Sequence, residues 1–423
     1  MTQPTFRVPT IDVLTRANPA PGLIFVATLN GPGQRGPLIL DDRGNVVWFK
    51  PLPTTAIDFR PQTYLGKPVL TWWEGTISQT GVGQGVGVIV DETYKEIARV
   101  SAGNGLYVDV HEFLLTPTGT ALVTIYNTVT RDATAVGGSA SQPTLDSIIQ
   151  EIDVKTGRVL FEWHSLDHVP ITDSYAPVLD PYDYFHINSI DLDYDGNLIV
   201  SARNTSAVYK VDKSTGNIVW TLGGRSSTIT LGPRVFFMYQ HDARVHSDGT
   251  LTIFDDGPGP SSQQARAIRV GLDVPGRSAV LLQEYAHPQA LLVAAMGNAQ
   301  QLAGDAMFVG WGTQPYMTEF GPLGDVRFDA KFSGDAWNYR AFRSPWVGLP
   351  KTKPTVVARK HVGKTTVYAS WNGSTQTAYW RVDEKTFRRT GFETVMSVPG
   401  RPTAVTALDA HRRPLPGGTT TLR

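Results

Sequence analysis

The sequence predicts an all-β protein, and more specifically a six-bladed β-propeller. Short apolar runs are separated by Asp, Asn and Gly turns, which is the pattern of antiparallel hairpins. The 41 glycines and 29 prolines fall between these runs, and no long segment has the 3.6-residue period of an amphipathic helix. The hairpins recur in pairs, and two hairpins make a four-stranded sheet, which is the unit of a propeller blade.

The predicted hairpins follow one another from the N-terminus onward. Each has an apolar run, a polar turn and a second apolar run, and they occupy residues 36–50, 86–100, 111–127, 148–165, 187–203 and 207–224. Two types alternate, one with a Gly or Asp-Gly turn, as in "DLDYDGNLIVSAR", and one of the form "VYKVDKSTGNIVW". The alternation indicates that one hairpin of each type forms a repeat.

Six repeats of this kind are expected in the chain. They lie near residues 56–100, 109–163, 186–222, 241–286 and 298–333, and from about 339 onward. Strands within residues 23–50 are expected to complete the last sheet and to close the ring. The predicted organisation is an N-terminal arm (1–22), the propeller with N-terminal strands closing it (23–385), and a small C-terminal β extension or tail (386–423).

The composition limits the possible function classes. Lys+Arg and Asp+Glu balance at 38 each, which gives no electrostatic reason to expect nucleic acid or an anionic membrane as a partner. The absence of cysteine excludes disulfides and thiolate chemistry. No apolar run is long enough for a membrane span, and the first 25 residues lack the pattern of a signal peptide, so neither is expected. The cellular compartment stays open.

Three of the nine histidines fall at the same place in their repeats. Counting back eight residues from the turn glycine gives His111 and His241, and the same count in the first repeat gives Asp58, with Arg60 two residues further on. In the repeat with a longer strand, His186 lies ten residues before the glycine. In a propeller this position begins the innermost strand, so three imidazoles are expected to converge at one mouth of the central channel.

A single histidine at the start of a strand is more often structural than catalytic. Three in one register favour a functional cluster, because core packing has no reason to choose imidazole repeatedly at the axis. The remaining histidines lie outside this register and are expected to be ordinary: His164, His168, His246, His287, His361 and His411.

Other uses of these residues are weaker alternatives. Three histidines can hold zinc, but an H-E-x-x-H motif is absent, and strand alternation is expected to point Glu112 and Asp242 away from the faces of His111 and His241. No G-x-S-x-G motif supports a serine hydrolase. The run "DLDYDG" starts like an EF-hand loop, but Ala202 stands where the bidentate Glu is needed, so a hairpin turn is the better interpretation.

Several motifs resemble one known family. The runs "DVHEFLLTPTGTALVT" (109–124), "YFHINSIDLDYDGNLIVSAR" (184–203) and "YQHDARVHSDGTLTIFDDG" (239–257) are similar to those of the arylsulfotransferases that work without a nucleotide sulfate donor, in particular the actinomycete and fungal branch. The segments "DFRPQTYLGKPVLTWWEG" (58–75) and "YRAFRSPWVGLP" (339–350) are also typical of that branch. The likeness extends over roughly residues 20–385 and implies a six-bladed propeller.

The resemblance also implies roles for individual residues. The family's sulfated nucleophile corresponds to His241, and its H-x-N-S-I motif to His186 and Asn188. The arginine that ends the following strand corresponds to Arg203, and the H-E-F histidine to His111. The implied reaction is ping-pong transfer of a sulfuryl group from an aryl sulfate to a phenol or alcohol, without a cofactor. One departure is Asn204, where the branch often carries His, and it leaves the acceptor side open.

Side chains near the expected mouth suit an aromatic small molecule. The candidate substrate-binding residues are Tyr184, Phe185, Tyr239, Trp311 and Arg60, although core packing explains any single aromatic residue among them equally well. Two other functions stay open from the sequence. One is a cofactor-free cyclase, isomerase or lyase that uses the same histidines on a small natural product, and the other is a propeller that binds small molecules without catalysis.

Overall fold

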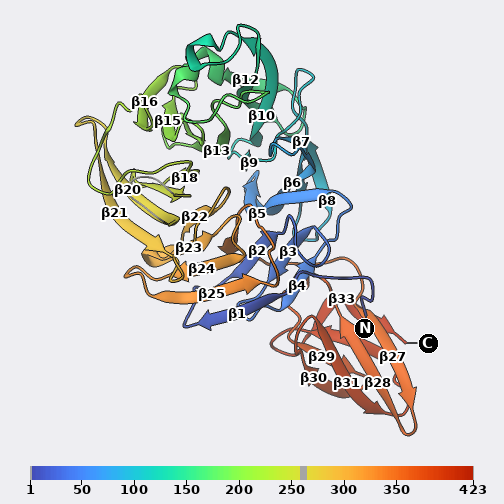
Figure 1. The fold of residues 1–423 in the computed structure, drawn as a ribbon. Helices are drawn as coiled ribbons and strands as arrows, with labels where there is room; N and C mark the ends of the chain where they lie inside the picture. The colour runs from blue at the N-terminus through green and yellow to red at the C-terminus, as the bar shows by residue number, and fades with distance from the viewer. Residues whose placement is uncertain (1, 258–263, 423) are drawn as a thin grey trace.

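The computed structural model describes residues 2–257 and 264–422 and consists mainly of β-strands (Figure 1). Residues 1, 258–263 and 423, which fall in the predicted arm, the predicted repeat 241–286 and the predicted tail, lie outside the described residues. Among the described residues, helical structure is limited to short 3-10 turns: η1 (Thr134–Val136), η2 (Ser165–Asp167), η3 (Ile171–Asp173) and η4 (Ala303–Asp305). No helix in the described part is long and apolar enough to cross a membrane.

Six sheets of four or five strands occupy the chain from β1 to β26, and each coincides with one expected repeat. The first two contain β5 (Thr55–Tyr64), β6 (Lys67–Ile77), β7 (Gly83–Val90) and β8 (Glu96–Val100), then β9 (Phe113–Leu115), β10 (Thr120–Arg131), β11 (Gln142–Asp153) and β12 (Val159–His164). The third contains β13 (Ile187–Leu192), β14 (Leu198–Ala202), β15 (Ala207–Val211) and β16 (Ile218–Gly223). The fourth contains β18 (His241–Val245), β19 (Leu251–Asp255), β20 (Arg266–Asp273) and β21 (Ser278–Ala286), with β17 (Thr230–Leu231) parallel to β21.

The last two of these sheets include strands from the N-terminus. The fifth contains β22 (Asn298–Gln301), β23 (Met307–Gly310), β24 (Tyr316–Phe320) and β25 (Val326–Phe332), with β1 (Ile11–Arg16) added at its outer edge. The sixth pairs β26 (Phe342–Ser344) with β2 (Leu23–Ala27), β3 (Pro37–Leu40) and β4 (Val46–Phe49). The expected pairing of residues 23–50 with the last sheet is therefore present, whereas part of the expected N-terminal arm is a strand of the fifth sheet.

Apolar packing arranges the six sheets around a common centre, in a propeller-like way (Figure 1). Each of six buried clusters lies between two consecutive sheets, and one of them, which includes Phe25, Trp48, Phe59 and Trp72, joins the sixth sheet to the first. Burying large apolar side chains between sheets is the main favourable term in such a fold. The sheets are thus held by their neighbours on both sides.

The strands nearest the centre are β5, β9, β13, β18, β22 and β26, one from each sheet. Three of them carry a bulge near the start, between Ile57 and Arg60, Ile187 and Ser189, and His241 and Arg244. Asp58, His186 and Asp242 have φ values of 55, 56 and 54° at or beside these bulges. A bulge re-aims the side chains beside it, and this feature decides what faces the channel.

The chain after β26 forms two further sheets (Figure 1). One contains β27 (Thr355–His361), β28 (Lys364–Ser370) and β31 (Glu393–Pro399), and the other contains β29 (Tyr379–Val382), β30 (Lys385–Arg388), β32 (Ala404–Leu408) and β33 (Pro414–Thr421). A single apolar cluster that includes Val367, Trp371, Trp380 and Met396 joins them. Within the described residues these strands pair only with one another. A division at residue 385 would separate β29 from β30, which are paired strands of the second sheet.

Candidate active site

Four of the predicted site residues line one cavity of about 440 Å³ at the centre of the ring. His111 precedes β9, His186 precedes β13, His241 begins β18, and Arg203 follows β14. Turn glycines with positive φ set this spacing, as at Gly119 and Gly249 (83 and 78°). The structure thus brings these four residues, which the repeat register or the resemblance singled out, into one cavity.

Each of the three histidines turns its Nδ1 atom toward a carboxylate. The pairs are His111 with Asp109, His186 with Asp183, and His241 with Asp256. A partner at Nδ1 fixes the ring orientation and the direction of Nε2. The three imidazoles are therefore held in defined positions by residues outside the predicted set.

His241 is the most deeply enclosed of the three, with 2% of its surface exposed. Its Nδ1 lies 2.9 Å from Asp256 Oδ2, but the two groups do not form a hydrogen bond. Its Nε2 accepts a hydrogen bond from the Met296 N–H at 3.3 Å. An Nε2 that accepts carries no proton, so the ring is the neutral Nδ1–H tautomer. Burial, together with the positive charge of Arg203, holds the pKa of His241 well below its ordinary value.

His111 and His186 lie side by side in the cavity that His241 also lines. Their ring centroids are 4.8 Å apart, and the ring of Tyr126 packs against both at 5.5 and 5.7 Å. Burial lowers the pKa of His186, and the carboxylate of Asp183 offsets this only in part. His186 is therefore neutral at neutral pH, and a carboxylate lies beside Nδ1 of each ring, Asp183 for His186 and Asp109 for His111.

Arg203 is held at the cavity wall by three contacts. Its guanidinium lies over the Tyr239 ring at 4.7 Å, Nη1 donates to Asn204 Oδ1 at 2.9 Å, and Nη2 donates to the Ala294 carbonyl at 3.2 Å. Its buried Nε has no hydrogen-bond partner within the described residues. Asn204, the departure from the family pattern, thus supports Arg203.

Asn188 and Arg60 do not line this cavity. Asn188 is fully buried, and its Nδ2 donates to the Gln240 carbonyl at 2.6 Å, so it supports the backbone that precedes His241. Arg60 contacts Glu112 and lines a separate cavity of about 450 Å³, which Arg244 and His246 also line. The structure therefore does not bring these two side chains into the histidine cavity.

The predicted aromatic residues are also elsewhere. Tyr184 and Phe185 belong to the apolar cluster between the second and third sheets, and Trp311 to the cluster between the fourth and fifth. Tyr239 does not line the cavity, and its ring packs against the guanidinium of Arg203. The first three thus lie in apolar cores between sheets. The cavity's apolar wall comes from residues that the sequence did not single out, namely Leu29, Ile57, Ile77, Val110, Met296, Trp337 and Tyr339.

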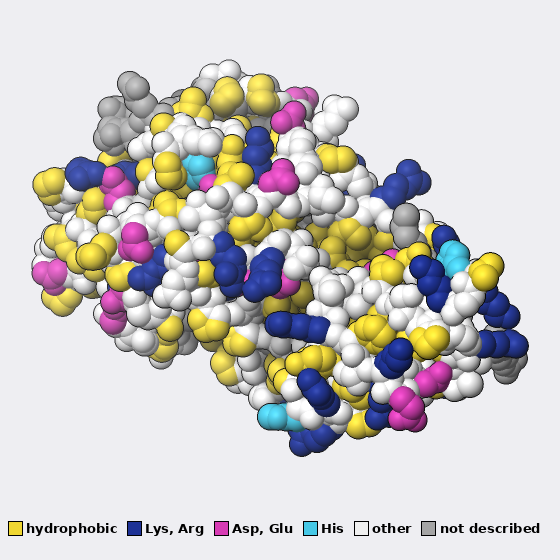
Figure 2. Space-filling model, turned by 90° about the horizontal axis from the view of Figure 1, so that it is seen from below, with side chains coloured by type: hydrophobic (Ala, Val, Ile, Leu, Met, Phe, Trp, Pro, Cys, Tyr) yellow, Lys and Arg dark blue, Asp and Glu magenta, His cyan; other side chains and the backbone are white. Residues whose placement is uncertain are grey.

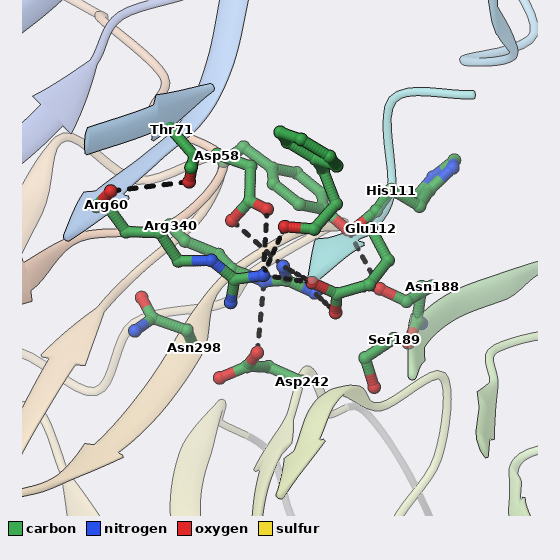
Figure 3. Close-up of polar contacts among 12 residues, drawn as sticks. Asp58, Arg60, Thr71, His111, Glu112, Asn188, Ser189, Asp242, Asn298 and Arg340 are labelled. Carbon is green, nitrogen blue, oxygen red and sulfur yellow. Dashed lines mark hydrogen bonds and ion pairs between the residues drawn. The ribbon is translucent and has the colours of Figure 1, made fainter. Parts of the chain in front are cut away.

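A cluster of three acidic and three basic side chains lies beside the cavity, and all are buried except Arg244, whose side chain is 15% exposed. Figure 3 labels the other five. Its members are Asp58, Glu112, Asp242, Arg60, Arg244 and Arg340. The opposite charges balance, as buried charges must. We call this group the axial charge cluster.

Arg340 is the centre of the axial charge cluster and is only 1% exposed. Its guanidinium lies 3.0 Å from Asp58 Oδ1, 3.3 Å from Glu112 Oε2 and 3.0 Å from Asp242 Oδ1, and it donates to the Asn188 carbonyl at 2.9 Å. Burial alone would raise the pKa of Glu112, but the guanidinium groups of Arg244, Arg340 and Arg60 outweigh it and hold that pKa below its ordinary value.

The expectation from strand alternation was wrong for Asp242 in the axial charge cluster. Asp242 was expected to face away from the axis, yet it contacts Arg340, and Glu112, expected on the face opposite to His111, contacts Arg340 as well. The physical reason is local backbone geometry. Glu112 precedes the first residue of β9, and Asp242 lies in the bulge of β18 with positive φ, so simple alternation does not apply.

Several functional candidates were missed from the sequence. Asp109 and Asp183 precede their histidines by two and three residues, a spacing that sequence inspection could have used. Asp256 lies across the hairpin from His241, whose register partner is Phe254, and only the strand pairing reveals it. Arg340 was missed because the counting started from histidines, and its repeat has no histidine in that register.

The fold and the site define an all-β, propeller-like protein with an enclosed cavity of ordered imidazoles and one guanidinium. A family model described as Arylsulfotransferase (ASST) matches residues 60–333, more than half of the chain. The chain belongs to the arylsulfotransferase family. No curated protein matches it.

Distant likenesses exist among solved structures. A protein of unknown function from Bacteroides caccae is 13% identical, with 76% of this chain and 98% of that chain covered and a TM-score of 0.47. A virginiamycin B lyase from Staphylococcus aureus is 11% identical, with 86% and 96% covered and a TM-score of 0.36. The Dos1 propeller is 12% identical, with 82% and 73% covered and a TM-score of 0.35. At these scores the likeness supports no statement about activity.

Substituting Arg340 tests whether the axial charge cluster holds the centre of the ring. The Arg340→Met variant leaves buried carboxylates uncompensated, so we expect a loss of about 3–5 kcal/mol in the free energy of unfolding, measured by urea titration at pH 7. The loss should shrink as the pH falls, because protonation removes the uncompensated charge. Arg16→Met, which breaks an exposed pair with Asp42, is the matched control and should leave the midpoint nearly unchanged. Equal effects of the two substitutions would contradict this account.

Proposed function

We propose that this protein transfers a sulfuryl group from an aryl sulfate to a phenol or alcohol through a sulfohistidine at His241. The observation that carries the proposal is the position of His241, a buried neutral imidazole that shares one cavity with Arg203, His111 and His186. Membership of the arylsulfotransferase family supports the reaction class. No cofactor is required for either step.

In the first step, Nε2 of His241 attacks the sulfur of the aryl sulfate. The S–N bond forms as the S–O bond to the aryl group breaks, and the phenolate leaves. A neutral nucleophile is needed because an imidazolium has no lone pair to offer, and the lowered pKa of His241 provides it. The Nδ1 side of the ring faces Asp256, an acid whose pKa burial raises well above its ordinary value and the charge of Arg203 lowers only in part.

In the second step, an acceptor hydroxyl attacks the sulfohistidine and restores His241. We assign His111 as the general acid for the leaving phenolate and the general base for the acceptor hydroxyl, because Asp109 stands ready to balance its protonated form. In the first step His111 gives its proton to the phenolate, and in the second step it takes a proton from the acceptor hydroxyl. His111 therefore ends the cycle as it began.

The remaining polar groups stabilise the sulfuryl oxygens. Arg203 presents a planar guanidinium held by Tyr239 and Asn204, and its position beside His241 suits the negative charge of the transferred group. His186 is a second polar group on the same wall. Asn188, first expected in this role, supports the Gln240 backbone instead. The aryl group fits against Ile57, Val110 and Trp337.

The proposed scaffold for this site is a six-bladed β-propeller. We interpret the six sheets as blades and the pairing of β2 with β26 as the closure of the ring. The β1 strand then extends the fifth blade, and the strands from β27 onward form a separate C-terminal β domain. The site lies where the innermost strands meet.

Removing the nucleophile tests the reaction. We expect His241→Ala to lower transfer from p-nitrophenyl sulfate to a phenol by roughly 10³-fold or more, and intact-mass and peptide analysis of the wild type with donor alone to find sulfate on His241. His246→Ala, one residue beyond the end of β18 and outside the cavity, is the matched control and should keep its activity. Retained transfer in His241→Ala would overturn the proposal, and turnover without any sulfuryl transfer would favour a lyase or isomerase.

The lowered pKa of His241 predicts an unusual pH profile. The imidazole stays neutral as the pH falls through 6.5, its ordinary pKa, so kcat/KM for p-nitrophenyl sulfate should not decline in that range. The decline should come only at lower pH, when His241 gains a proton and loses its lone pair. Nitrophenolate is a good leaving group, which keeps a contribution from His111 small. A half-maximal rate at or above pH 6.5 would contradict this prediction.

Asp256 is proposed as a positioning residue for His241. We expect Asp256→Asn to slow sulfohistidine formation by about 10–100-fold, the usual cost of losing a carboxylate behind a functional imidazole, with Asp256→Glu recovering part of the rate. Single-turnover measurement of nitrophenolate release separates this step from the transfer to the acceptor. An unfolding midpoint like that of the wild type excludes a merely structural effect. Unchanged nitrophenolate release would remove Asp256 from the mechanism.

A further inference from the structure

The balanced charge of the whole chain conceals a strong asymmetry between its two parts. Residues 351–423 contain 13 Lys and Arg against 4 Asp and Glu, so this part carries a net charge of +9 and residues 1–350 carry −9. Figure 2 shows Lys and Arg side chains gathered on the C-terminal part, with few acidic ones among them. The argument from overall neutrality against an anionic partner therefore does not hold for the C-terminal β domain.

Three of these 13 Lys and Arg residues lie at the tip of one hairpin. The strands β27 and β28 are joined through "RKHVGK" (359–364), and all six of these residues are exposed. His361 pairs with Lys364 across the turn, so Lys360, His361 and Lys364 surround Val362. Val362 is fully exposed, at 103% relative surface. We call this segment the basic hairpin.

A neighbouring strand adds a further cation to the basic hairpin. Pro399 of β31 pairs with Lys364, and Thr365 Oγ1 donates to the Gly400 carbonyl at 2.6 Å, which brings Arg401 to the same end of the sheet. Within the described part of the chain, Lys360, Lys364 and Arg401 form no ion pair. The carboxylate of Asp383 accepts a hydrogen bond from Thr403 Oγ1.

We propose that the basic hairpin docks the protein on a membrane surface that contains anionic lipid. Lys360, Lys364 and Arg401 would contact the headgroups, while Val362 enters the boundary with the acyl chains. The exposed valine favours a lipid surface over nucleic acid or an anionic polysaccharide, because an apolar tip gains nothing from a polyanion in water. Unpaired cations around an apolar tip are the combination that an anionic lipid interface recognises.

The position of the basic hairpin fits this role. It lies at the end of the C-terminal β domain that points away from the six sheets (Figure 1). Docking there leaves the central cavity and its residues free of the membrane. The inference therefore does not depend on the proposed sulfuryl transfer.

Vesicle co-sedimentation of the full chain tests the proposal. At low ionic strength we expect binding to vesicles of phosphatidylcholine with roughly one third phosphatidylglycerol, and little binding to phosphatidylcholine alone. Removing two cations in Lys360→Ser/Lys364→Ser should lower the partition coefficient about 25-fold, at about fivefold per cation. Val362→Ser should lower it about tenfold. The matched control Lys67→Ser/Lys155→Ser, exposed on the other part, should change it little.

Two outcomes would overturn the proposal. One is equal binding to the two kinds of vesicle. The other is a combination of two results: Val362→Ser binds the anionic vesicles as tightly as the wild type does, and the wild type binds duplex DNA or heparin equally tightly. This combination would assign the basic hairpin to polyanions in general. Unfolding midpoints like that of the wild type show that the variants are folded.

Discussion

The ion pairs of Arg340 are the interaction on which the centre of this molecule depends. Through one guanidinium, the segment before β26 contacts Asp58 of β5, Glu112 before β9, the Asn188 carbonyl of β13 and Asp242 of β18. Neighbouring Ala341 exchanges two hydrogen bonds with Asn298 of β22. The segment that contains Arg340 and Ala341 thus connects all six central strands. Breaking a buried network of this kind costs far more than breaking a surface pair, because it leaves charge without a partner.

The same short segments hold both the axial charge cluster and the histidine cavity. His111 is followed by Glu112 and His241 by Asp242, so each imidazole is one residue from a carboxylate fixed by Arg340. Tyr339, next to Arg340, donates to the His111 carbonyl at 3.0 Å. A site built on rigid neighbours keeps its groups in place without reorganising during the reaction. The buried charges therefore serve the geometry of the cavity as well as the fold.

The sequence predicted those features that depend on repeat spacing and missed those that depend on tertiary packing. Turn glycines set the strand lengths, so counting from them located His111, His186 and His241. Alternation failed at Asp242 because a bulge breaks the two-residue period there, and nothing local reveals a bulge. Asp256 meets His241 only through strand pairing across the hairpin. The aromatic residues were misplaced because blade cores and a channel mouth both favour large apolar side chains.

The axial charge cluster also bears on the order of the proposed reaction. Three of its members, Arg60, Asp242 and Arg244, line the second cavity, while His111 and His241, next in sequence to Glu112 and Asp242, line the histidine cavity. The histidine cavity, of about 440 Å³, has room for a small aromatic molecule beside His241. In the proposed reaction, storing the sulfuryl group on His241 lets donor and acceptor use this one cavity in turn.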